Sequence, residues 1–184
     1  NYHYKSSSFY RQFLKNKGFS TFTEWRVGRI IDGLNGLQSL GINKIHFVGM
    51  GAKLDEYKSR IRSQDSKIDC FFHGFLERNK VFEMYKASHL NLLPSNSEGF
   101  PKTISEGACF GAIPIVSNIS SIPQYVNSDN GFLWDLKKGS FSNYIKNLKF
   151  SKKELKYKAM NAHKFAPLFT FDAYVKKLKH HKIL

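Results

Sequence analysis

The stretch HLNLLPSNSEGFPKTISEGACF, residues 89–110, decides the fold class of this chain. Residues 89–93 form a short and mostly apolar run that predicts a buried strand, and residues 103–110 predict a helix. The loop between them carries one carboxylate, Glu98, and the helix carries a second, Glu106. In an open parallel sheet, ligands bind where a strand's carboxyl end turns into the next helix. This stretch therefore predicts a strand, a ligand-binding loop and a helix.

The same alternation of strands and helices continues on both sides of this stretch. Strands are expected at residues 21–27, 44–48, 68–72, 112–116 and 131–134, and helices at 32–40, 54–61 and 79–87. Most of these strands are continuous apolar runs, which are typical of parallel strands buried on both faces. Right-handed crossovers then predict an α/β fold with a doubly wound, Rossmann-like parallel sheet of about six strands.

The length of 184 residues is that of one ordinary domain. Residues 1–18 have no strand partner, so we interpret them as a lead-in segment from a missing N-terminal domain, with an aromatic-faced helix over residues 1–17. Residues 19–150 are expected to form the Rossmann-like domain. Residues 151–184 are expected to form a C-terminal helical tail, which is rich in Lys and aromatic residues.

The composition limits the class of partner. A formal net charge of +15 favours nucleic acid, a phosphate-bearing small molecule or an acidic membrane. Lysine is spread through every segment and no nucleic-acid-binding motif is present, so a nucleic-acid-binding module ranks low. Cys70 and Cys109 lack metal-ligand spacing, which predicts buried, reduced thiols in a cytoplasmic protein. No apolar run reaches the length of a membrane span.

Several turns at the expected strand ends share glycine and polar residues. Glycine lets a backbone approach a bulky ligand closely, and the donors of Arg29 suit a phosphate. Pairing of Arg29 with Asp32 is the alternative. His73 is expected to be a hydrogen-bonded structural residue rather than a base. The turns, which we expect along one crevice, are residues 28–29, 49–51, 73–75 and 95–102.

These motifs resemble the donor half of retaining GT-B glycosyltransferases, specifically glycosyltransferase family 4, the glycosyltransferase group 1 domain. The match in order and spacing covers about residues 20–135. Its most specific piece is Ser-Glu-Gly-Phe-Pro-x-x-x-x-Glu, residues 97–106. The resemblance implies the C-terminal half of a GT-B fold, which binds a nucleotide-sugar donor. The other matching segments are residues 27–29, 47–51, 72–75, 94–95, 111–116 and 130–133.

The resemblance also implies roles for single residues. Glu98 corresponds to the catalytic-site Glu at the donor sugar and its transferred carbon. Glu106 corresponds to the Glu that binds the ribose hydroxyls, which suits a carboxylate because it accepts two hydrogen bonds. Gly99, Phe100 and Pro101 correspond to the segment whose backbone N–H groups touch the sugar and diphosphate, although Pro101 has no N–H.

The remaining donor-binding residues follow in the same way. Arg29 corresponds to the residue that neutralises the diphosphate leaving group, and Lys102 is either a phosphate or sugar contact or a solvated helix start. Family members generally dispense with a metal at the diphosphate and this chain has no Asp-x-Asp motif, so no metal or other cofactor is expected. The glycines and the aromatic residue expected around the nucleotide are Gly28, Gly49, Gly51, Gly74 and Phe75.

Two departures from the family pattern bear on activity. Asn35-Gly36 stands where the family usually has Lys-Gly, so a second phosphate contact is lost unless Lys102 or Lys53 supplies the charge. Residues 120–124, Ser-Ser-Ile-Pro-Gln, replace the common Gly-Gly-x-Pro-Glu, which leaves the role of that loop open. A non-catalytic nucleotide-binding half is therefore an alternative function.

The leading expectation is the donor domain of a hexosyltransferase for a growing cell-surface polysaccharide, such as capsule or lipopolysaccharide, or a lipid-linked acceptor. A nucleotide-sugar epimerase-like protein is a further alternative, against which the Glu pair argues. The acceptor site belongs to the missing N-terminal half, so the fragment alone is expected to bind donor and to be inactive. A cytoplasmic location is expected, and basic residues 176–182 leave open a peripheral position at the inner face of the membrane.

Overall fold

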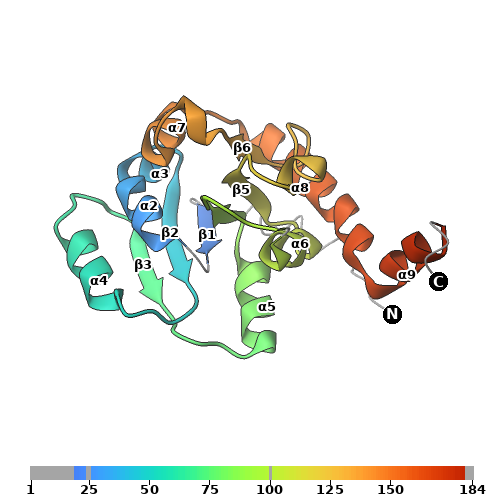
Figure 1. Cartoon of the computed structure of the whole chain (residues 1–184). Coiled ribbons are helices and arrows are strands. Elements are labelled where there is room, and N and C mark those ends of the chain that lie inside the picture. The colour runs from blue at the N-terminus through green and yellow to red at the C-terminus, as the bar shows by residue number, and fades with distance from the viewer. Residues whose placement is uncertain (1–18, 24–25, 100, 181–184) are drawn as a thin grey trace.

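The computed structural model describes residues 19–23, 26–99 and 101–180. The helix expected over residues 1–17 lies outside the described residues. Six strands form one sheet in the order β3-β2-β1-β4-β5-β6, and all neighbours are parallel (Figure 1). The predicted doubly wound sheet is confirmed. The strands are β1 (Phe19–Thr23), β2 (Ile42–Phe47), β3 (Asp69–Phe72), β4 (Leu90–Leu93), β5 (Ile113–Ser117) and β6 (Phe132–Trp134).

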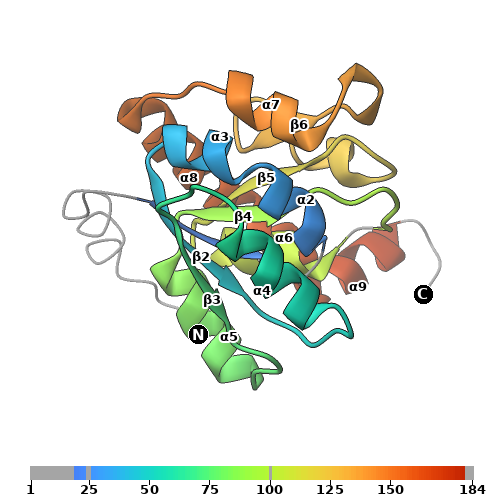
Figure 2. The ribbon, with the colours of Figure 1, turned by 90° about the vertical axis from the view of Figure 1, so that its left-hand side faces the viewer.

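Helices cover both faces of this sheet. Successive residues of a strand point to opposite faces. Leu92 of β4 packs in a core with residues of the first two helices and α7 (Phe141–Asn147), whereas Leu93 packs in a second core with residues of α6 (Lys102–Cys109) and the C-terminal end of α8 (Lys152–Phe165). Helix α7 lies against α2 and α3 (Figures 1 and 2). The helices between strands are α2 (Val27–Asp32), α3 (Leu34–Ser39), α4 (Leu54–Arg62), α5 (Arg78–Ala87) and α6 (Lys102–Cys109), with the short 3-10 turn η1 (Ile122–Gln124).

The start of the first helix differs from the prediction. A strand was expected to end at Val27, with a turn at Gly28-Arg29 and a helix from Asp32, but residues 27–32 form α2. The physical reason is the apolar spacing of Ile30, Ile31, Leu34 and Leu37, which are all fully buried and form the inner stripe of α2 and α3. Gly28 and Arg29 therefore lie in a helix rather than at a strand end.

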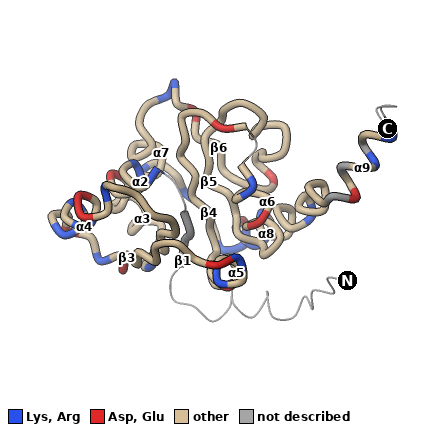
Figure 3. The backbone as a smooth tube through the Cα atoms, turned by 60° about the horizontal axis from the view of Figure 1, so that its bottom comes forward, with Lys and Arg blue, Asp and Glu red and all other residues tan. Residues whose placement is uncertain are grey.

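Helices make up most of the described residues from 136 to 180. They are η2 (Leu136–Lys138), α7 (Phe141–Asn147), α8 (Lys152–Phe165), η3 (Ala166–Phe169) and α9 (Phe171–His180). Ser151 caps α8 by accepting a hydrogen bond from the Glu154 N–H at 3.1 Å. Figure 3 shows Lys and Arg spread over several elements, including α4, α5 and α9. Among the helices described, none is both long enough and apolar enough to cross a bilayer.

The prediction of two buried thiols is wrong for Cys109. This residue is exposed, because the buried stripe of α6 consists of Thr103, Ile104, Gly107 and Ala108 and leaves the last position outside it. Cys70 is half-buried. Burial, and then the charge of Asp69, raise the pKa of its thiol to about 11, so it stays protonated at neutral pH.

Candidate functional site at the strand ends

The loop between β4 and α6, residues 94–101, holds the first predicted carboxylate in a defined position. Ser95 is fully buried, and its hydroxyl donates a hydrogen bond of 2.6 Å to Oε1 of Glu98. Ser121 donates from its hydroxyl to the carbonyl of Gly99 at 3.0 Å. The buried Ser95 thus orients the half-buried Glu98 side chain. Gly99 is exposed, with no atom within 4 Å of the position of a Cβ, so the loop is open to solvent there.

The second predicted carboxylate lies one turn into the following helix. Glu106 is half-buried on α6, whose first residue is the exposed Lys102. Pro101 precedes the helix and no side chain caps its amino end. The backbone N–H groups and the positive dipole end at such a helix start favour an anion. The β4–α6 unit therefore presents two carboxylates, a cationic side chain and an anion-favouring helix end.

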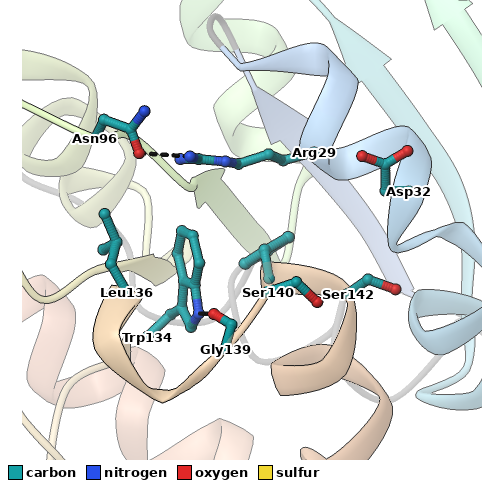
Figure 4. Close-up of a pocket in the computed structure, with 9 residues that line it drawn as sticks. Arg29, Asp32, Asn96, Trp134, Leu136, Gly139, Ser140 and Ser142 are labelled. Carbon is teal, nitrogen blue, oxygen red and sulfur yellow. Dashed lines mark hydrogen bonds between the residues drawn. The ribbon is translucent and has the colours of Figure 1, made fainter.

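Arg29 reaches this loop from α2, although it is not at a strand end. Its guanidinium donates to the Pro94 carbonyl at 2.7 Å. It also donates to Oδ1 of Asn96, as Figure 4 shows. It also lies over the ring of Trp134, with 5.1 Å between Cζ and the ring centroid. Asp32, the alternative partner of Arg29, instead accepts a hydrogen bond of 2.5 Å from Arg60.

A pocket of about 370 Å³ lies beside this arginine, between α2, the end of β6 and the start of α7 (Figure 4). This pocket was not predicted from the sequence, because most of its lining comes from residues 134–142, for which no site was expected. One feature of the sequence pointed to this pocket, namely Trp134, an aromatic residue at the carboxyl end of an expected strand. The lining includes Arg29, Asn96, Trp134, Ser140 and Ser142.

The glycine turns after β2 and β3 are in direct contact with each other. The Gly49 N–H donates to the Gly74 carbonyl at 2.7 Å, and both residues have positive φ, 119° and 66°. These left-handed conformations are ones that glycine adopts without strain. Phe75 is 78% exposed at the rim of this pair of turns. Because all strands are parallel, the pair lies at the same edge of the sheet as the β4–α6 loop.

The other predicted site residues have mixed placements. Gly51 has open space around it, whereas a Cβ on Gly28 would lie 3.3 Å from the Arg60 guanidinium, so Gly28 faces α4. Phe100 lies outside the described residues. Asn35, in place of the family's Lys, is exposed on α3. Gly36 lets α3 approach α7, because its Cβ would lie 2.9 Å from the Ile145 side chain.

His73 has a hydrogen-bonded partner, as expected, and that partner is His46. Nδ1 of His46 and Nε2 of His73 lie 2.9 Å apart, and the two rings stack with centroids 5.2 Å apart. His46 also stacks on Phe71, at 5.1 Å. Burial lowers the pKa of His46, and the charges of His73 and Lys44 lower it further. The lowered pKa favours the neutral imidazole form of His46, which lies beside the 73–75 turn.

This pair predicts a dependence of stability on pH. The folded protein holds His46 neutral at pH values where the same imidazole is protonated in the unfolded chain. The free energy of unfolding contributed by this group is therefore fully present above about pH 6.5 and falls as the pH drops through that value. Denaturant unfolding at about pH 7.5 and 5.5 measures the effect. His46→Phe keeps a ring against Phe71 but takes up no proton, so its stability should fall less. An equal fall in both proteins contradicts the prediction.

The fold and the site together define an open-sheet, Rossmann-like domain with its candidate site at the strand ends. The family model described as "Glycosyl transferases group 1" matches residues 30–165, and the chain belongs to this family. No curated protein sequence matches the chain.

Solved structures resemble the chain in fold. The pneumococcal O-GlcNAc transferase GtfA, in complex with UDP and GlcNAc, superposes with a TM-score of 0.71 and 18% identity, over 91% of this chain and 36% of that one. The catalytic domain of cholesterol-α-glucosyltransferase from Helicobacter pylori gives 0.66 and 18%, over 83% and 99%. The C-terminal domain of LpcC, a group 1 family protein from Francisella tularensis, gives 0.67 and 16%, over 91% and 93%. The fold is that of the C-terminal domain of GT-B glycosyltransferases, and the chain spans about a third of the GtfA length.

Proposed function

We propose that this chain is the donor-binding half of a retaining glycosyltransferase of family 4, which transfers a hexose from a nucleotide sugar. The observation that carries the proposal is the β4–α6 unit. There, Glu98 is oriented by the buried Ser95, and Glu106 follows on a helix whose amino end has no side-chain cap. Membership of the group 1 family supports the same assignment.

The proposed roles follow from the chemistry of each group. The diphosphate lies at the amino end of α6 beside Lys102, Glu106 accepts hydrogen bonds from the ribose hydroxyls, and Glu98 lies at the sugar. In transfer, the bond from the anomeric carbon to the diphosphate oxygen breaks and a bond to the acceptor hydroxyl forms. The nucleoside diphosphate leaves with the electron pair, and the proton of the acceptor hydroxyl passes to it. Positive charge at the diphosphate accelerates this step because the negative charge grows in the transition state.

The partners and location are part of the proposal. A further GT-B domain supplies the acceptor site, so the chain alone binds donor and transfers nothing. The acceptor is a cell-surface polysaccharide, such as capsule or lipopolysaccharide, or a lipid-linked sugar, reached from the cytoplasm or the inner face of the membrane. No metal or other cofactor takes part.

A thermal-shift screen of the chain against nucleoside diphosphates tests the function. At about a hundredfold excess over the dissociation constant, the diphosphate of the correct base should stabilise the fold by about 2–3 kcal/mol. Inorganic pyrophosphate at equal ionic strength is the control, because a chain with net charge +15 also attracts anions non-specifically. The proposal fails if no nucleoside diphosphate stabilises the chain beyond pyrophosphate.

A further inference from the structure

We propose that Arg29 is a positioning residue, which holds the β4–α6 loop so that Glu98 is placed to receive the donor sugar. This role differs from that of a ligand of the diphosphate, which the resemblance implied. The inference rests on the proposed function of the loop, and it follows from what lies on either side of the guanidinium.

Trp134 provides a fixed platform under Arg29. Trp134 is 4% exposed, its Nε1 donates to the Gly139 carbonyl at 3.1 Å, and its ring meets Phe141 edge-on with 5.4 Å between the ring centroids. The indole therefore has little freedom to move. A guanidinium over the face of a Trp ring is favourably placed, and the attraction increases when water is excluded.

Arg29 is also fixed from its own helix. The next two residues, Ile30 and Ile31, are fully buried in the core, so the backbone of α2 is anchored at this point. The backbone of Arg29 is anchored by α2 and its guanidinium lies on Trp134, so its N–H groups are presented to the loop in a defined direction.

The loop is then held by hydrogen bonds at several residues between 94 and 99. Arg29 donates to the Pro94 carbonyl and to the Asn96 side chain, where the loop leaves β4. Ser95, between these two residues, donates to Glu98, and Ser121 of the neighbouring turn donates to Gly99. Arg29 thus fixes the two residues that flank Ser95, and Ser95 orients the carboxylate. Glu98 is positioned through this chain of contacts, without touching Arg29 itself.

The two roles of Arg29 predict different binding data. A positioning residue affects the contact between Glu98 and the sugar, so its loss weakens a nucleotide sugar more than the bare diphosphate. A diphosphate ligand affects both equally. The roles also differ at Asn96. Removing this acceptor loosens the loop in the first case, whereas in the second case it frees an Arg29 N–H for the phosphate and leaves or raises the affinity.

The test compares Arg29→Met, Asn96→Ala and the double variant by titration calorimetry with uridine diphosphate and uridine diphosphate-glucose. Guanosine diphosphate and its mannose conjugate replace them where the unaltered chain binds those instead. We expect both single variants to bind the nucleotide sugar about tenfold more weakly, the diphosphate within about twofold, and the double variant no more weakly than Arg29→Met. Arg60→Met, an arginine of α4 that pairs with Asp32 and Glu56, is the matched control and should change neither affinity.

Hydrogen exchange on the same variants reports on the loop without any ligand. Arg29→Met and Asn96→Ala should speed exchange at residues 95–99 and leave the β4 amides protected, whereas Arg60→Met should not. Arg29→Lys should not rescue either measurement, because an ammonium cannot provide the planar fork that bridges two acceptors. Equal loss of diphosphate and nucleotide sugar in Arg29→Met, with rescue by Lys and no loss in Asn96→Ala, overturns the inference and leaves the proposed function intact. An unaltered chain that binds no nucleotide refutes the function instead.

Discussion

Glu106→Ala is expected to weaken the binding of nucleoside diphosphates by about ten- to a hundredfold. A carboxylate that accepts hydrogen bonds from two ribose hydroxyls contributes about 1.5–3 kcal/mol in such a charged contact, and each 1.4 kcal/mol is about tenfold in affinity. Glu106 is half-buried on α6 and has a well-defined helix position, so the truncation should leave the fold unchanged. Titration calorimetry of the chain and the variant measures the difference.

The 2′-deoxynucleoside diphosphate makes this test specific. The unaltered chain should bind the deoxy form more weakly than the ribo form, whereas Glu106→Ala should bind the two alike, because the partner of the hydroxyl is gone. Glu83→Ala is the matched control, since Glu83 lies on α5 and pairs with Lys86 at 2.6 Å. If Glu106→Ala still distinguishes ribose from deoxyribose as the unaltered chain does, Glu106 does not bind the ribose.

Gly131→Ala is expected to destabilise the fold by about 1–3 kcal/mol, the range for overpacking a close-packed core. A Cβ at this position would lie 2.6 Å from the Val126 side chain and 2.8 and 2.9 Å from the side chain and carbonyl of Pro114. The Pro114 carbonyl belongs to the backbone of β5 and cannot rotate away. The backbone at residue 131, directly before β6, must therefore shift. Denaturant unfolding, with the free energy taken from the midpoint and slope, measures the loss.

Gly51→Ala is the control for this stability measurement. No atom lies within 4 Å of a Cβ at Gly51, so the added methyl group meets open space and the free energy of unfolding should change little. Equal stability of the Gly131→Ala and Gly51→Ala proteins contradicts the packing described around β6.

The sheet was predictable from local patterns, but one helix start was not. Continuous apolar runs such as residues 112–116 indicate buried parallel strands whatever their partners are. At residues 27–32 two patterns overlapped. The β-forming residues before Gly28 favoured a strand and a turn, while Ile30, Ile31 and Leu34 carried the helical spacing, and burial of that stripe decided for the helix.

The contacts that complete the candidate site were not predictable in this way. Arg29 and Trp134 are far apart in the chain, and nothing in their residue types or spacing indicates that they meet. Lys158 is a similar case. It resembles the solvated lysines of the tail, yet it is 4% exposed, donates to the Ser128 carbonyl and lies 4.5 Å from the Phe132 ring centroid. Such pairs depend on how the elements pack, and the sequence pattern of one element does not contain that information.

The β4–α6 loop was the part of the candidate site that the sequence located best. The strand, the loop and the helix lie where the pattern placed them, with Glu98 and Glu106 on the expected elements. Residue types also suggested that Glu98 belonged to a small polar loop, but the buried Ser95 that orients it was not singled out. The ligand contacts of both carboxylates stay predictions.

A crystal structure of the chain with the nucleoside diphosphate that stabilises it most is the most direct test of the donor site. We expect the diphosphate at the amino end of α6 beside Lys102 and the ribose hydroxyls within hydrogen-bonding distance of Glu106. A nucleotide bound elsewhere, such as in the pocket beside Trp134 and Ser140 with Glu106 untouched, would contradict this expectation.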